Sequence, residues 1–297
     1  ARVTLTPELS MQMQAAIGSD IVMQFDDVAA GDSSRERYEE AMERSLRWAV
    51  RCKTEHVSLR ATNGSEAISS DLLKEIASSP AAPRNDKAML FAIVQGGTHE
   101  DLREKSARGL MEIGFDGYAN GGLTDGEKRE DAYRIVKHVC EILPQDKPRY
   151  FMGGGMPEEI VAYVQMGVDM FDCVIPTRNA RHGTLFVWNQ DPAMIDFGSR
   201  GLPADAEALA GRQPASGRRL KPAATFYDIL RITNEKYQLD QSPLDSHCDC
   251  ETCKTTSRAY LRHLFSVQEL LALRLATIHN LHFYLRLMKE LRMWIEL

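Results

Sequence analysis

The chain has 297 residues, 43% of them hydrophobic, and a formal net charge of −6. This size permits one large domain or two small ones with a substantial core. It contains no apolar run long enough to span a bilayer, and its first residues lack a signal-peptide pattern, so we expect a cytoplasmic protein without membrane insertion. An acidic chain argues weakly against a nucleic-acid partner.

The charge is uneven along the chain. Cations outnumber carboxylates in the last forty residues, where Glu269, Glu290 and Glu296 face a larger basic set: Arg258, Arg262, Arg274, Arg286, Lys289 and Arg292. A basic face of this kind can attract a phosphate backbone, although a solvated helix face is the plain alternative.

Short apolar runs alternate with amphipathic stretches through the first part of the chain. Thr6 as an N-cap followed by Pro7 predicts a helix that ends at Gly18. The predicted strands are 20–25, 89–94, 115–119, 149–152 and 170–175, and the other predicted helices are 34–51, 99–113, 127–143 and 157–166. Each strand is followed by polar or glycine residues.

Strands that alternate with helices indicate parallel βαβ organisation. Functional side chains at the ends of such strands are typical of the (β/α)8 TIM-type barrel, whose active sites lie at that face. Five strand-helix units are fewer than the eight of a closed barrel, so we expect the first strands of the barrel to be missing from these residues.

Three regions are predicted. Residues 1–188 form the barrel part that carries the active site, with an insertion at 57–87 that contains one short helix near 72–77. Residues 189–240 form a second insertion, loop-like over 189–224, and a connection. Residues 241–297 form a zinc-binding subdomain and C-terminal helices. Residues 183–188 are predicted to form a hairpin strand.

A cluster of cysteines carries the strongest single signal. Cys248, Cys250 and Cys253 lie within six residues, too close together for an easy set of internal disulfides. Three thiols and one imidazole suit a closed tetrahedral zinc site, which is structural. His279 is the predicted fourth ligand, and His282 and His247 are its competitors. A metal site also suits a reducing compartment.

The stretch from Phe171 to Arg181 is the second signal. Asp172 is predicted to lie inside an apolar strand, where a carboxylate is costly unless it has a function. Arg178 and Arg181 follow on the adjoining loop and could hold a phosphate or a base edge, with surface ion pairing as the alternative.

The ends of the earlier strands supply groups that could bind a flat heterocycle. Asp26 offers a carboxylate, Gln95 an amide, and the glycines at 121–122 exposed backbone N–H groups. Met152 could pack on an aromatic ring, although a buried methionine more often belongs to the core. Each of these signals is weak alone, because tight turns use glycine pairs everywhere.

Together, in chain order, the motifs FDD, QGG, GGL, MGGG, FDCVIPTRNARHG, CDCETC and TIHN resemble those of one family, the tRNA-guanine transglycosylases. The resemblance covers the chain from Thr6 to Trp294 outside the two insertions. It implies a zinc-containing (β/α)8 barrel and a pentosyltransferase that exchanges guanine at position 34, the anticodon wobble position of a tRNA with a GUN anticodon. The incoming base would be queuine or 7-aminomethyl-7-deazaguanine.

The resemblance also implies a role for each motif residue. Asp172 would be the nucleophile that holds the tRNA as a covalent ester. The base would be recognised by a group of strand-end residues: Asp26, Gln95, Gly122, Leu123 and Met152. Arg178 and Arg181 would hold anticodon-loop nucleotides, and zinc on Cys248, Cys250, Cys253 and His279 would anchor the C-terminal subdomain. Losing the metal is expected to impair folding and tRNA binding without a direct effect on Asp172.

The sequence departs from the family in several places. The family's first strands, its DSGG aspartate and its base-sandwiching aromatic residue do not occur in these residues, so we expect them in a preceding part of the protein. Val28 favours queuine as the incoming base, whereas the stretch 114–118 is bacterial-like. A homodimer or a heterodimer with a homologous accessory subunit is expected. The alternative is that this chain is itself a non-catalytic tRNA-binding accessory subunit, but such subunits lose the residues that correspond to Asp172 and the two arginines.

Overall fold

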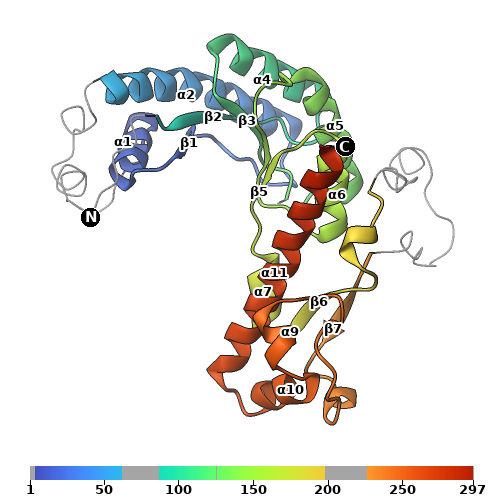
Figure 1. Cartoon of the computed structure of the whole chain (residues 1–297). Coiled ribbons are helices and arrows are strands. Elements are labelled where there is room, and N and C mark those ends of the chain that lie inside the picture. The colour runs from blue at the N-terminus through green and yellow to red at the C-terminus, as the bar shows by residue number, and fades with distance from the viewer. Residues whose placement is uncertain (1–3, 62–86, 125, 198–225, 297) are drawn as a thin grey trace. The chain divides into compact units, whose positions relative to one another are not determined.

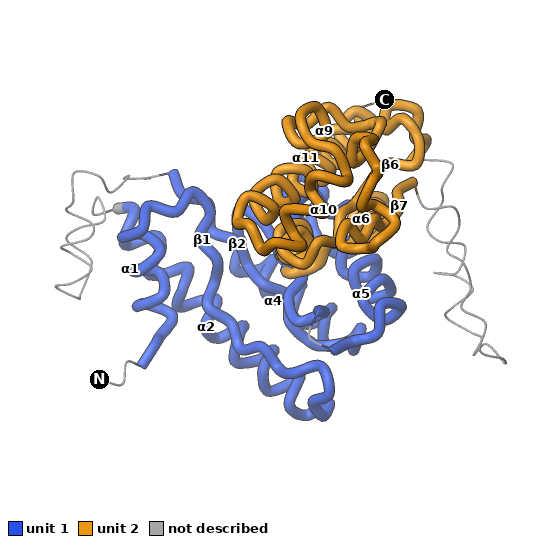
Figure 2. Tube along the Cα trace, turned by 90° about the horizontal axis from the view of Figure 1, so that it is seen from below, with its two compact units in different colours: residues 1–152, 166–171 blue, residues 153–165, 172–297 orange. Residues whose placement is uncertain are grey.

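The computed structural model describes residues 4–61, 87–124, 126–197 and 226–296. The chain divides into two compact units, which Figure 2 colours separately. Unit 1 comprises Ala1–Met152 and Met166–Phe171, and unit 2 comprises Gly153–Gln165 and Asp172–Leu297. None of the helices in the described residues is long and apolar enough to cross a membrane.

Unit 1 is built on one parallel sheet. Its five strands are β1 (Ile21–Met23), β2 (Met89–Val94), β3 (Gly117–Asn120), β4 (Arg149–Phe151) and β5 (Met170–Phe171), and they are hydrogen-bonded in chain order. Helices connect them, so every strand ends at the same edge of the sheet. This is the arrangement predicted for a (β/α) barrel.

The helices of unit 1 are α1 (Pro7–Ile17), α2 (Arg35–Ala61), α4 (Glu100–Ile113) and α5 (Arg129–Ile142). Figure 1 shows α2, α4 and α5 covering one face of the sheet, with α4 between its two neighbours. Strands β2 and β3 are buried along their whole length except at Met89, the first residue of β2. The Thr6 hydroxyl accepts from the N–H of Leu9, and Gly18 ends α1 at φ 81°, as the sequence predicted.

Helix α2 ends ten residues later than predicted. Its last turns bury Cys52, His56 and Leu59, which recur at helical spacing and continue the apolar stripe. The polar residues at 53–55 concealed this stripe, so the predicted insertion begins inside a helix. The rest of the insertion, including the short helix predicted near 72–77, lies outside the described residues.

Unit 2 contains α6 (Pro157–Gln165), α7 (Ile175–Arg181), β6 (Thr184–Trp188), η1 (Pro192–Met194), β7 (Tyr227–Arg231), η2 (Glu235–Tyr237), α9 (Glu251–Thr255), α10 (Arg258–Ser266) and α11 (Leu270–Ile295). Strands β6 and β7 pair antiparallel, so the predicted hairpin strand is confirmed. Its partner was not predicted, and most of the predicted insertion at 189–224 lies outside the described residues.

Aromatic rings form the centre of unit 2 where α11 packs on the hairpin. Phe283 stacks on Trp188 with ring centroids 4.2 Å apart, and Phe186 lies 5.8 Å from Phe283 and 5.4 Å from Tyr284. Such ring pairs add to the free energy gained by burying apolar area. Helix α11 is therefore held against β6, the strand that follows Asp172 and α7 in the chain.

Strand β5 is shorter than predicted. It ends at Phe171, so Asp172 lies just beyond the strand and is exposed, which corrects the expectation of a carboxylate inside an apolar strand. Pro176 explains the change, because proline lacks the N–H that a strand needs and is favoured in the first turn of a helix. Residues predicted as the end of the strand therefore begin α7 instead.

Asn120, the last residue of β3, is fully buried, and neither polar atom of its amide has a hydrogen-bond partner among the described residues. An unsatisfied buried polar group costs about 1–3 kcal/mol. We therefore expect Asn120→Leu, which replaces the amide by methyl groups of similar shape, to raise the free energy of unfolding by about 1 kcal/mol in urea titrations.

Asn280→Leu is the matched control for Asn120→Leu. The Asn280 amide accepts from Phe186 N and donates to the carbonyls of Pro176 and Thr184, so its loss should destabilise the protein. If both variants lost stability equally, the view that Asn120 is unsatisfied would be wrong.

Candidate active site and metal centre

Two adjacent carboxylates follow β1 and occupy different environments. An Asp26 oxygen accepts from Gln95 Nε2 at 2.7 Å. Burial raises the pKa of Asp26, and the hydrogen bond from Gln95 opposes this only in part. Asp27 is paired with Arg37 and Arg44, and the hydrogen bond from Arg37 is the main reason that its pKa is lowered.

Helix α2 holds the segment that carries these carboxylates. The Phe25 ring stacks on Trp48 with centroids 4.9 Å apart. The N–H of Asp27 donates to Ser45 Oγ at 2.9 Å, and the N–H of Phe25 donates to the Cys52 sulfur. The backbone of the segment is thus fixed, and the Asp26 side chain reaches Gln95 at the end of β2.

Gln95 lies directly over the two glycines that follow β3. A Cβ placed on Gly121 would come within 3.1 Å of Gln95 Nε2 and 3.8 Å of Met152 Sδ. A Cβ on Gly122, which has φ 61°, would meet Gln95 Oε1 at 3.0 Å. These glycines leave room for the amide because they have no side chain.

The structure therefore brings together Asp26, Gln95, Gly122 and Met152, all predicted from sequence as base-binding residues. Leu123, the fifth, directly follows Gly122, and its side chain is buried. Among the described residues, no group accepts a hydrogen bond from the N–H of Gly122. The site offers a carboxylate, an amide and a backbone donor, which are the groups needed to bind a polar, flat ring.

Asp172 belongs to unit 2, where the backbone orients it. One carboxylate oxygen accepts from the N–H of Gly153 at 2.8 Å. Gly155, two residues after Gly153, has no space for a side chain, because a Cβ there would come within 2.6 Å of the Cys173 sulfur. An exposed carboxylate with a fixed orientation can act as a nucleophile.

Helix α11 supports both segments around Asp172. The Tyr284 hydroxyl donates to the carbonyl of Gly155 at 2.8 Å, and the Asn280 amide donates to the carbonyl of Pro176 at 3.0 Å. These two residues, four apart on one helix face, were not predicted. The only sequence signal was the position of Asn280 next to His279.

Arg178 and Arg181 lie on α7 three residues apart, and both are exposed. Neither guanidinium forms an ion pair with a carboxylate of the described residues. The alternative of surface ion pairing is therefore not what this structure contains. Two free guanidinium groups on one short helix can bind phosphate oxygens.

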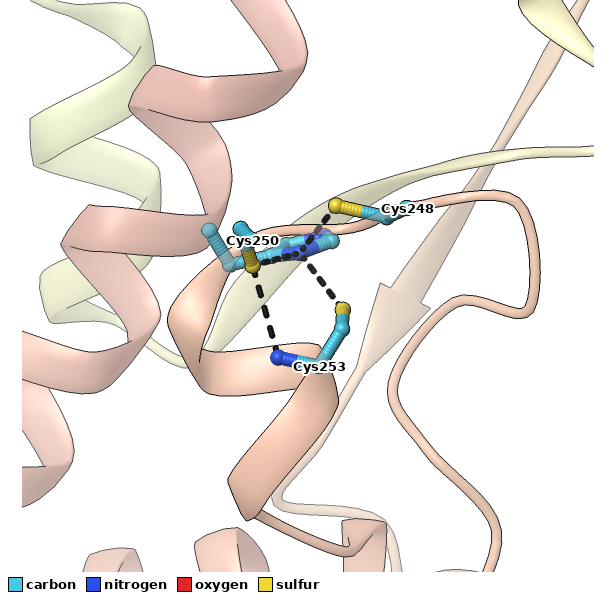
Figure 3. Close-up of side chains that lie close together, drawn as sticks. Cys248, Cys250 and Cys253 are labelled. Atoms are coloured by element: carbon cyan, nitrogen blue, oxygen red, sulfur yellow. Dashed lines mark hydrogen bonds between the residues drawn. The ribbon is translucent and has the colours of Figure 1, made fainter.

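The cysteine cluster gathers four potential metal ligands in unit 2. The ligand atoms of Cys248, Cys250, Cys253 and His279 all lie within 4.8 Å of one another. Figure 3 shows the side chains of the three cysteines converging around a common point. His279 Nδ1 lies 3.7 Å from the sulfurs of Cys248 and Cys250 and 3.3 Å from that of Cys253. This group could hold a metal ion.

The two competing histidines have other positions. His247 is exposed, and its backbone N–H donates to the Asp245 carboxylate. His282 Nδ1 lies 3.5 Å from the Cys248 sulfur, but its other ring nitrogen contacts the Asp249 carboxylate at 3.2 Å. His279 is fully buried, and its Nε2 hydrogen-bonds the carbonyl of Phe186 at 2.8 Å, which is the outer contact expected of a metal-binding imidazole.

The other three cysteines, Cys52, Cys140 and Cys173, do not belong to this centre, and the first two are buried. Burial raises the pKa of the Cys52 thiol to about 11 and that of the Cys140 thiol to about 12, so both stay protonated as core residues.

The fold and site define a (β/α)-barrel protein with a candidate Cys3His metal centre. The family model described as Queuine tRNA-ribosyltransferase matches residues 1–297. The chain therefore belongs to the queuine tRNA-ribosyltransferase family.

Curated relatives agree with this assignment. The chain is 42% identical over 296 residues to the queuine tRNA-ribosyltransferase of Psychrobacter cryohalolentis, a match that covers 100% of the chain and 62% of the relative. It is 42% identical over 297 residues to that of Acinetobacter baylyi, covering 100% and 61%. It is 42% identical over 295 residues to that of Shewanella halifaxensis, covering 99% and 62%. The chain thus spans about three fifths of these relatives.

Proposed function

We propose that the protein containing this chain is a tRNA-guanine transglycosylase that exchanges guanine at the anticodon wobble position for queuine or 7-aminomethyl-7-deazaguanine. The observation that carries the proposal is Asp172, an exposed carboxylate in the FDCV motif whose oxygen is oriented by the Gly153 N–H. The family membership of the whole chain supports the same activity.

The proposed reaction is a double displacement at the ribose. An Asp172 oxygen attacks C1′ as the C1′–N9 bond breaks, and guanine leaves with the bonding electrons and takes up a proton. The product is an ester between Asp172 and C1′ of the tRNA. The incoming base, deprotonated at N9, then attacks C1′ and releases the carboxylate. A carboxylate suits both steps because it stabilises an oxocarbenium-like transition state and is also a leaving group.

Base recognition is proposed for the group of unit 1 residues. The Asp26 carboxylate would accept from N1–H and the 2-amino group, while Gln95 and the Gly122 N–H would donate to O6. The Leu123 carbonyl would face the 7-substituent, and Met152 would lie against the ring. The hydrogen bond between Gln95 and Asp26 supports this assignment because it holds the two groups together before a base binds.

Zinc is the proposed metal of the Cys3His cluster. A tetrahedral ion with bonds of about 2.3 Å to sulfur and about 2.0 Å to nitrogen separates its nitrogen ligand from each sulfur by about 3.5 Å. The observed separations of 3.3 and 3.7 Å between His279 and the sulfurs fit this geometry. Four protein ligands leave no open position, so zinc would stabilise unit 2 and take no part in the reaction.

Incorporation of labelled guanine into tRNA by the whole protein tests the proposed activity. Incorporation into tRNAs with a GUN anticodon, and none into a tRNA whose wobble base is not guanine, is expected. Equal incorporation into both would contradict the proposed position.

Only one of the two neighbouring aspartates should affect guanine binding when it is substituted. Asp26→Asn is expected to weaken guanine binding about 10- to 100-fold, because it puts an amide in place of an acceptor of charge-assisted hydrogen bonds. Asp27→Asn should leave guanine binding unchanged, since Asp27 is paired with Arg37 and Arg44. Equilibrium binding of labelled guanine measures both.

The melting temperatures of the same two variants should shift in opposite directions. The pKa of Asp26 is raised above its ordinary value of 3.8, so its ionised form destabilises the fold at neutral pH. Asp26→Asn should therefore raise Tm at pH 7.5, and the difference should vanish below pH 3.8. The pKa of Asp27 is lowered, so Asp27→Asn should lower Tm at pH 7.5. The same sign for both variants would contradict these environments.

A further inference from the structure

Arg103 on α4 is a fully buried arginine that binds backbone rather than a carboxylate. Its Nε donates to the carbonyl of Gly97 at 2.8 Å, and Nη1 donates to that of Val94 at 2.6 Å. Its Nη2 donates to the carbonyls of Gly121 at 2.8 Å and Gly122 at 3.2 Å. A buried cation is costly, and one that spans two strand ends has a role beyond filling the core.

The four carbonyls lie at the ends of the two strands that carry the base-binding group. Val94 is the last residue of β2 and Gly97 lies in the loop after it, on either side of Gln95, and Gly121 and Gly122 follow β3. Ser106, one turn further along α4, accepts from the N–H of Gln95 at 3.1 Å. Helix α4 therefore holds the backbone of both loops, whereas Asp26 contacts the Gln95 side chain.

The contact between Arg103 and the Gly121 carbonyl also orients the N–H of Gly122, because the peptide bond between the two glycines is planar and trans. The carbonyl of Gly121 and the N–H of Gly122 belong to one peptide unit and point in opposite directions. Because Arg103 on α4 binds this carbonyl, the N–H of Gly122 points away from the Arg103 guanidinium.

We propose that Arg103 is a positioning residue of the base pocket, which holds the loops after β2 and β3 so that the Gly122 N–H and the Gln95 amide face the 6-oxo group of a guanine-type base. This proposal rests on the proposed function. Arg103 acts through these groups and does not itself touch the base.

Arg149 provides a matched control within the same unit. It is also buried, and it donates to the carbonyls of Leu143 at 2.8 Å and Gly167 at 3.4 Å. Those residues precede β4 and β5, so Arg149 braces the N-terminal edge of the sheet and Arg103 the C-terminal edge. A lysine at either position keeps the charge but cannot reproduce the planar fork of donors.

The experiment compares Arg103→Lys with Arg149→Lys in the whole protein. Hydrogen exchange followed by mass spectrometry, without any ligand, is expected to show at least about tenfold faster exchange over 94–98 and 120–123 in Arg103→Lys only. Equilibrium binding should show guanine affinity lowered at least about tenfold in Arg103→Lys, with tRNA affinity within about twofold of the parent protein. Arg149→Lys should lower Tm but bind guanine normally.

Equal guanine affinity in the two lysine variants, or exchange rates over 120–123 that do not change in Arg103→Lys, would overturn the proposal. If the parent protein bound no guanine, the proposed function would fail, and the hydrogen-exchange comparison would still decide whether Arg103 holds the two loops. If Arg103→Lys were unfolded, Arg103→Gln, which keeps two amide donors, would replace it in the same comparison.

Discussion

Asp172→Asn in the whole protein is expected to reduce guanine exchange at least about 10³-fold, because removing a nucleophile takes away the covalent pathway. The substitution keeps the size of the side chain and the oxygen that can accept from the Gly153 N–H, so the fold should persist. Guanine and tRNA should still bind within about twofold, since Asp172 is assigned to the chemical step. Initial rates of labelled guanine incorporation measure the effect.

Asp228→Asn is the matched control for Asp172→Asn. Asp228 is another exposed carboxylate of unit 2, on β7, and it should leave the exchange rate unchanged. A loss of exchange in both variants would indicate a general effect of charge on tRNA binding, and an active Asp172→Asn would remove the nucleophile from the proposed mechanism.

Removing the metal is expected to have the second large effect. Structural zinc sites contribute about 10–16 kcal/mol of apparent binding free energy, which equals or exceeds the stability of a typical domain. We therefore expect the chelated protein to lose the cooperative unfolding transition of unit 2 and its affinity for tRNA. Circular dichroism during titration with a chelator, followed by zinc repletion, measures the loss and its recovery.

Ligand variants separate the proposed ligands from their neighbours. His279→Ala and Cys250→Ser should bind less than one equivalent of zinc, whereas His282→Ala and Cys140→Ser should keep one equivalent. Cys140 is buried as well but lies in unit 1, outside the cluster. Full zinc content in His279→Ala would show that the fourth ligand was assigned wrongly.

The structure suggests how metal loss would reach the Asp172 segment indirectly. The His279 ring is hydrogen-bonded to the carbonyl of Phe186 on β6, and the amide of the next residue, Asn280, donates to the carbonyl of Pro176 in α7. One turn later, the Tyr284 hydroxyl donates to the carbonyl of Gly155, and Gly155 packs against Cys173. Loosening α11 at the metal would thus release the segments on both sides of Asp172, although the ligands do not contact that carboxylate.

Features that depend on nearby residues could be predicted from the sequence. The apolar run that forms β2 has the same limits as predicted, because strands of a parallel sheet that is covered on both faces read as nearly continuous apolar runs. The cysteine cluster could be predicted since three of its ligands lie within six residues. The strand-end groups Asp26 and Gln95 were predicted because parallel strands end at one edge of a sheet.

Features that depend on distant contacts could not be predicted. Strand β7 is short, carries exposed polar residues and is specified by its pairing with β6. Arg103 looks like an ordinary surface cation of an amphipathic helix until the structure places four carbonyls around it. The end of β5 was missed because the residues from Val174 are apolar, although Pro176 was a signal that the strand had ended.

The most direct test of the account is isolation of the covalent intermediate. The whole protein is incubated with a tRNA carrying a GUN anticodon in the absence of a competing base, denatured, digested and examined by mass spectrometry. We predict a ribose adduct on the peptide that contains Asp172, formed by the parent protein and absent from Asp172→Asn. Guanine exchange without any adduct, or an adduct on a different residue, would contradict the double displacement at Asp172.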